Sequence, residues 1–138
     1  MVECEDRIGT DPPADDLAVV SGVAALPDAG TSGPLQAVPR VNGLRLRYFA
    51  KRGLVAGSDR TIDLVVPPEE RHRLAITWGS PGRLTWHLRV SCHAADATWL
   101  TFAGGYVTTR RGCVSLIVRA DGRQERARIG VGARCVEE

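Results

Sequence analysis

Short runs in which apolar and polar side chains alternate occupy most of the chain from residue 44 onward. A period of two places neighbouring side chains on opposite faces of a β-strand, so each run predicts a strand with one face in a core. Asp121-Gly122 is a dipeptide typical of tight hairpins, and it predicts that residues 113–120 pair with residues 124–131. Seven or eight short strands are expected, with no convincing helix among them.

The run from residue 84 to residue 92 shows the alternation most clearly. One face of this predicted strand carries Leu84, Trp86, Leu88, Val90 and Cys92. Residues 61–66 and residues 73–78 repeat the pattern. A further run, residues 98–107, is interrupted by Gly104-Gly105, which indicates a β-bulge or the close approach of another backbone.

These strands predict an all-β fold: an antiparallel β-sandwich, immunoglobulin-like or jelly-roll-like, stapled by disulfides, with a small β-barrel as the alternative. The length of 138 residues is that of one domain. Residues 1–16 are expected to form an acidic N-terminal arm and residues 17–138 a single β domain. Within that domain, residues 17–26 are expected to form a strand or short helix. Residues 27–43, rich in proline and glycine, are expected to form a long loop suited to binding.

Four widely spaced cysteines constrain the fold further: Cys4, Cys92, Cys113 and Cys135. No two of them form a Cys-x-x-Cys pair, which argues against a zinc ribbon or a thioredoxin-type site. Two disulfides fit better than buried free thiols, a metal site or a reactive thiol. Three pairings are possible. We favour Cys92 with Cys113, between two core strands, and Cys4 with Cys135, between the termini.

Structural disulfides persist outside the cytosol, so an extracytoplasmic location is expected. The first residues lack the apolar segment of a signal peptide, and no apolar run is long enough to span a membrane. We therefore expect that an export signal or an anchor was removed, leaving a protein that is secreted or anchored through a segment absent here.

The charge of the chain is unevenly distributed. Residues 1–28 hold seven acidic side chains and one basic one, whereas the remainder holds nine acidic and seventeen basic side chains, a net charge of +8. A basic body favours an anionic surface, although solvated arginines on strand faces explain the same composition. We do not expect nucleic acid as a partner, because the aromatic residues that stack on bases make up only 5% of the chain.

Catalytic and metal-binding patterns are weak. His87 and His93 flank the end of one predicted strand with opposite orientation, so joint coordination of a metal is not expected. Ser91, His93 and Asp96 lie close in sequence, but no nucleophile-elbow motif surrounds the serine. We expect no catalytic site, no metal and no cofactor.

Exposed aromatic and arginine side chains are the better candidates for a contact surface, together with the 27–43 loop and Gly104-Gly105. Aromatic side chains can anchor a partner, although core packing explains them equally well. The candidate binding residues are Tyr48, Phe49, Trp99, Tyr106, Arg110 and Arg111.

Three segments of the C-terminal half resemble a group of uncharacterised actinobacterial exported or membrane-anchored proteins. Residues 101–107 hold an aromatic-x-Gly-Gly-aromatic motif, residues 112–118 form an apolar strand led by a cysteine, and residues 129–135 end in Gly-x-x-Cys. The Cys4-Glu5-Asp6 start and residues 51–66 are also similar. The resemblance implies an extracytoplasmic domain with paired cysteines, and it implies no activity.

We therefore expect a non-enzymatic binding or structural module outside the cytoplasm at a cell surface. Its partner would be a cell-envelope component or another protein. The alternative is an enzyme, or an accessory or sensor domain, that acts on a cell-envelope polymer.

Overall fold

Strands dominate the structure, a computed structural model that describes residues 2–79, 82–94 and 96–136. Thirteen strands and two short 3-10 turns, η1 (Cys4–Asp6) and η2 (Pro68–Glu70), occur in these ranges. All pairings between the named strands are antiparallel. The predicted all-β antiparallel fold is therefore confirmed.

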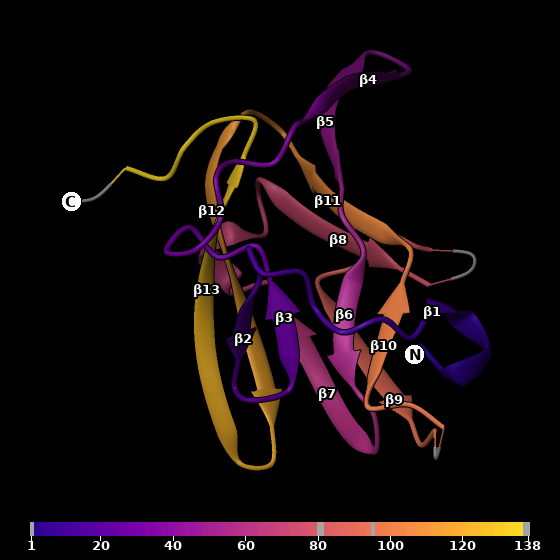
Figure 1. Cartoon of the computed structure of the whole chain (residues 1–138). Coiled ribbons are helices and arrows are strands. Elements are labelled where there is room, and N and C mark those ends of the chain that lie inside the picture. Colours follow the sequence, from indigo (N-terminus) through magenta and orange to yellow (C-terminus); the bar gives the residue numbers. More distant parts are fainter. Residues whose placement is uncertain (1, 80–81, 95, 137–138) are drawn as a thin grey trace.

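The strands form three sheets (Figure 1). The long sheet contains, in spatial order, β13 (Arg123–Val131), β12 (Gly112–Ala120), β7 (Arg60–Val65) and β9 (His87–Cys92). The five-stranded sheet contains β1 (Arg7–Gly9), β10 (Trp99–Phe102), β6 (Leu54–Gly57), β3 (Ala24–Leu26) and β2 (Ala18–Val20). The hairpin sheet contains β4 (Val38–Asn42), β5 (Arg45–Lys51), β11 (Gly104–Thr108) and β8 (Leu74–Trp78).

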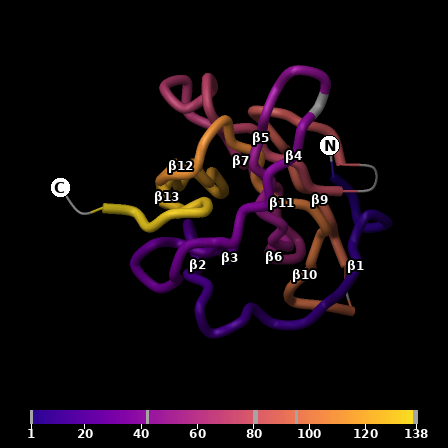
Figure 2. The backbone as a smooth tube through the Cα atoms, turned by 90° about the horizontal axis from the view of Figure 1, so that it is seen from above, coloured from indigo at the N-terminus to yellow at the C-terminus, as the bar shows by residue number. Residues whose placement is uncertain are grey.

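One hydrophobic core joins the three sheets. The five-stranded sheet lies over the long sheet, as the two views at right angles show (Figures 1 and 2). The predicted inward faces of residues 61–66 and 73–78 are confirmed, because their alternate apolar side chains are buried. The largest fully buried side chains come from all three sheets: Trp78, Tyr106, Phe102, Leu26, Leu54, Ile62, Leu64, Leu74, Ile76, Leu100, Leu116 and Ile129.

Two stretches of chain pass directly from the five-stranded sheet into the hairpin sheet. One passes from β6 back to β5 through Arg52-Gly53, and the other runs from β10 to β11 through Ala103. The stretches meet where the Arg52 amide donates a 3.0 Å hydrogen bond to the Gly104 carbonyl. A Cβ atom on Gly104 would overlap the Thr77 carbonyl, and one on Gly105 would overlap the Ala50 carbonyl. The predicted close backbone approach at the glycine pair is confirmed.

The predicted pairing of the cysteines is wrong, because both disulfides of the structure differ from it. Cys4 pairs with Cys92, and Cys113 pairs with Cys135. Cys92 pairs across the sheet with the first residue of β7, whereas Cys113 is the second residue of β12 and lies beyond the last paired residue of β7. The two cysteines therefore lie at opposite ends of the long sheet, and β7 separates their strands. Each terminal segment is tied to the body separately.

The predicted strand at residues 84–92 is too long. β9 begins at His87, and Leu84 and Trp86 are exposed rather than buried. Before His87 the chain leaves the sheet, because Thr85 exchanges hydrogen bonds with Ile76 of β8. Trp86 then lies under the guanidinium of Arg71, 5.5 Å from the ring centroid.

Two expectations for the first third of the chain are refined. Residues 17–26 hold two strands, β2 and β3, and residues 27–43 are not loop throughout, because β4 occupies their end. In the part of the chain that the structure describes, no helix has the length and apolar character needed to cross a membrane.

Candidate binding surface

The β4–β5 hairpin projects from the body of the molecule (Figure 1). Asn42 pairs with Arg45, so the turn contains Gly43 and Leu44. Gly43 is the first of the two turn residues and has a φ of +64°, a conformation that glycine adopts without steric cost, and glycine is favoured at this position of two-residue hairpin turns. Gly43 was therefore the sequence signal for this hairpin, although we expected loop there.

A groove of about 490 Å³ lies at the base of the hairpin. It lies between residues 32–36, which belong to the predicted binding loop, and the ends of β4 and β5. Phe49 lines it, and the guanidinium of Arg40 lies 4.7 Å from the centroid of the Phe49 ring. The groove therefore presents an aromatic surface beside a cation.

The remaining charges of the groove are mostly positive. Lys51 and Arg52 line it, and Asp16 pairs with Arg52 at 3.3 Å. Among the described residues, neither Arg40 nor Lys51 has an acidic partner within ion-pair distance. Two cations of the groove are thus available to an anionic ligand.

No family model, no curated protein and no solved structure matches this chain. What this chain binds therefore has to be inferred from the geometry of its own surface.

Four of the predicted binding residues lie at the hairpin end of the molecule. Phe49 lines the groove, while Tyr48 faces the other side of β5 and carries the Arg111 guanidinium 4.9 Å above its ring. Arg110 is exposed beside Arg111, in the turn between β11 and β12. The structure thus brings Tyr48, Phe49, Arg110 and Arg111 to one end of the molecule, although not to one face.

The other two predicted binding residues lie elsewhere. Tyr106 is fully buried and packs edge-on against Trp78, with ring centroids 5.1 Å apart, so it belongs to the core. Burial raises the pKa of its hydroxyl. Trp99 is half-buried on β10, whose neighbours are β1 and β6 rather than the hairpin.

The residues weighed for catalysis are engaged with other partners rather than with one another. Cys92 is held in a disulfide, Asp96 pairs with Arg7 at 3.4 Å, and His93 lies 3.5 Å from the exposed Asp59. His87 lines a different cleft, beside the acidic η1 turn. Among the described residues, no group of three His, Cys, Asp or Glu side chains could hold a metal ion.

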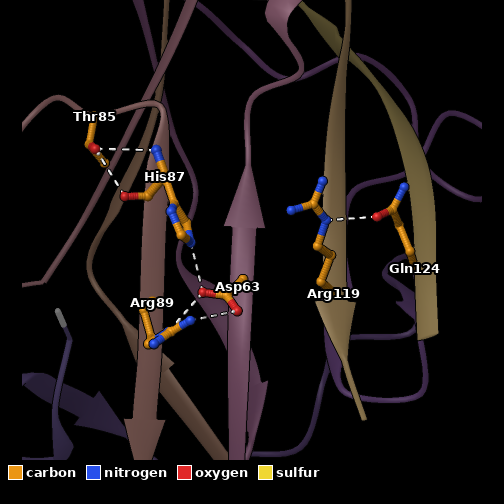
Figure 3. A network of polar contacts seen from close by, with 6 residues as sticks. All are labelled: Asp63, Thr85, His87, Arg89, Arg119 and Gln124. Atoms are coloured by element: carbon orange, nitrogen blue, oxygen red, sulfur yellow. Dashed lines mark hydrogen bonds and ion pairs between the residues drawn. The ribbon is translucent and has the colours of Figure 1, made fainter. Parts of the chain in front are cut away.

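Two arginines on the outer face of the long sheet have side-chain acceptors within the molecule, whereas Arg40 and Arg47 of the hairpin have no acidic partner in the described ranges. Arg126 pairs with Glu69 at 2.9 Å, and Arg119 donates to Gln124 at 2.7 Å (Figure 3). A backbone hydrogen bond at Glu69 and the Arg126 side chain lower the pKa of Glu69. Intramolecular pairing makes this arginine face a weaker candidate for an anionic ligand than the groove.

Asp63 on β7 accepts hydrogen bonds from two side chains of β9 (Figure 3). His87 Nε2 lies 2.7 Å from Asp63 Oδ1, and Arg89 Nε lies 2.9 Å from the same oxygen. Partial burial raises the pKa of Asp63, but the bonds from Arg89 and His87 outweigh it. They hold the pKa below the ordinary value of 3.8.

Asp63→Asn is expected to lower the free energy of unfolding near neutral pH by about 1 kcal/mol or less, because both partners are half exposed. A lowered folded-state pKa stabilises the fold above pH 3.8, and this stabilisation is lost as the pH falls through the folded-state value. Melting temperatures of the two proteins should therefore converge below about pH 4. A gap that persists in stronger acid would contradict this role of Asp63.

Proposed function

We propose that this protein is a non-enzymatic binding module that works outside the cytoplasm at a cell surface. In this proposal the groove beside the β4–β5 hairpin binds an anionic segment of a cell-envelope polymer. The observation that carries the proposal is the pair of unneutralised cations, Arg40 and Lys51, on either side of Phe49. An anionic ligand binds most strongly to cationic side chains that have no acidic partner within the protein.

The local sequence supports an anionic ligand. Between Asp28 and Asp59 the chain contains five basic residues and no acidic one. The groove's own acid, Asp16, comes from another part of the chain and is occupied by Arg52. An approaching carboxylate or phosphate therefore meets attraction along the hairpin side of the groove.

The disulfides support the proposed location outside the cytoplasm. All four cysteines are paired, and each pair ties a terminal segment to the sheets. Such bonds persist in oxidising compartments and are rare in the cytosol. His93 lies beside Asp59 and Asp96 pairs with Arg7, so among the described residues no hydrogen bond links Ser91, His93 and Asp96, which supports a binding role over a hydrolytic one.

Titration calorimetry with polygalacturonate, which carries one carboxylate per sugar, tests the groove. We expect salt-sensitive binding, and we expect Arg40→Gln combined with Lys51→Gln to weaken it about tenfold, because each exposed ion pair contributes up to about 1 kcal/mol. The matched control, Arg119→Gln with Arg126→Gln, removes the same charge from the long sheet and should bind as the unchanged protein does. Equal losses in both variants would indicate attraction by net charge and would refute the groove.

A further inference from the structure

The exposure of β5 rises steadily toward the hairpin turn, along the side that faces the core. Ala50 is 0% exposed and Tyr48 is half-buried, but Leu46 is 45% exposed and Leu44 is 105% exposed. Alternate residues of a strand share a face, so Ala50, Tyr48 and Leu46 form one line, and Leu44 follows in the turn just before β5 begins. The side of β5 that is buried in the core at Ala50 is therefore exposed to solvent near the hairpin turn.

The neighbouring strand extends this apolar side. Val41 of β4 lies directly opposite Leu46 and is 73% exposed. Residues directly opposite each other in an antiparallel pair point to the same face. Val41, Leu44 and Leu46 thus form an exposed aliphatic tip, and nothing in the described part of the chain covers it.

Cations surround the aliphatic tip. Arg45 and Arg47 flank Leu46 on β5 and point to the opposite side of the hairpin, whereas Arg111 stacks over Tyr48 at the base of the tip, with Arg110 beside it. None of these four arginines has an acidic partner within ion-pair distance in the described ranges. The chain also contains no acidic residue between Asp96 and Asp121.

We propose that the tip of the β4–β5 hairpin inserts into the surface of an anionic lipid bilayer. Val41, Leu44 and Leu46 enter the boundary between headgroups and acyl chains, and the surrounding arginines contact lipid phosphates. Apolar side chains framed by basic ones are the combination that holds a peripheral element in this boundary. Long arginine side chains reach phosphates while their carbon chains lie along apolar surface.

The size of the tip favours a lipid surface over a protein partner. The projecting part, residues 38–47, contains ten residues. A stable protein interface uses about 20–30 residues on each side. Shallow insertion needs only a few apolar side chains, because anionic lipids add attraction for each nearby arginine.

This inference does not depend on groove binding. None of the tip residues or the four arginines lines the groove. Groove variants and tip variants therefore separate the two proposals.

Flotation with vesicles made of equal parts phosphatidylglycerol and phosphatidylcholine tests the tip. The unchanged protein is expected to float with these vesicles and not with pure phosphatidylcholine vesicles. Leu44→Ser with Leu46→Ser should reduce binding about tenfold or more, and Arg45→Gln or Arg111→Gln should each reduce it about fivefold. The matched control is Ile8→Ser with Val19→Ser, two exposed apolar residues of the five-stranded sheet, and it should bind normally.

Three results would overturn the proposal. One is a folded protein that ignores phosphatidylglycerol vesicles, and another is undiminished binding by the double-serine variant. The third is a vesicle-independent dimer in sedimentation experiments that the double-serine variant abolishes, which would show that a second copy covers the tip. Because Leu44 is fully exposed and Leu46 is nearly half exposed, the double-serine variant should lose little stability and should still bind polygalacturonate.

Discussion

Gly105→Ala is expected to lower the free energy of unfolding by about 3 kcal/mol or more. The new Cβ would overlap the Ala50 carbonyl, which belongs to the fully buried end of β5. That carbonyl cannot retreat without breaking the pairing of β11 with β5, where Tyr106 lies opposite Ala50. Urea denaturation monitored by tryptophan fluorescence would measure the loss.

Gly104→Ala should be at least as damaging, for two reasons. Its Cβ would overlap the Thr77 carbonyl, and its φ of +151° is a conformation that side chains disfavour. Gly33→Ala is the matched control, because a Cβ there meets nothing within 4 Å, and its effect should stay within about 0.5 kcal/mol. If Gly105→Ala and Gly33→Ala unfolded at the same urea concentration, the close approach of strands at this corner would be disproved.

The glycine pair shows what a single sequence can predict. An interruption of an apolar strand by Gly104-Gly105 indicates a β-bulge or the close approach of another backbone, because glycine otherwise weakens a strand. The alternation in residues 61–66 and 73–78 likewise predicts which faces are buried, since one side of each strand must enter the core. Both inferences rest on the conformation of one segment.

Properties that depend on strand order were not predictable in the same way. The cysteine pairing follows from the position of β7 between β9 and β12, and no local pattern encodes that position. Leu84 and Trp86 have the same phase as Leu88, yet the chain leaves the sheet before His87. The position of a side chain in an alternating run therefore predicts whether that side chain is buried only for residues that belong to the strand.

Only part of the candidate surface was predictable, because some of its contacts depend on how the strands pair. Tyr48 and Phe49 are adjacent on β5, and the sequence indicated both as aromatic candidates close to a proline-rich and glycine-rich segment. The approach of Arg111 to Tyr48 required the pairing of β5 with β11, because β11 leads into the turn that holds Arg111. The exposed tip was missed because Leu44 and Leu46 have the phase of a core face.

Removing the Cys4–Cys92 disulfide is expected to cost more than removing Cys113–Cys135. The first bond closes a loop with a sequence separation of 88 residues and the second a loop of 22 residues. The entropy of the unfolded chain predicts losses of about 4.5 and about 3.5 kcal/mol, respectively. Paired Cys→Ala variants, compared by urea denaturation under non-reducing conditions, would measure the difference.

The two closed loops do not overlap in the sequence, so their effects on the unfolded chain are separable. A variant lacking all four cysteines should therefore lose about the sum of both effects. A greater loss from the shorter loop would show that native contacts around Cys135, rather than chain entropy, set its stabilisation. Peptide mapping without reductant provides the direct test of the pairing, because a peptide that joins Cys92 to Cys113 would contradict the strand order on which this prediction rests.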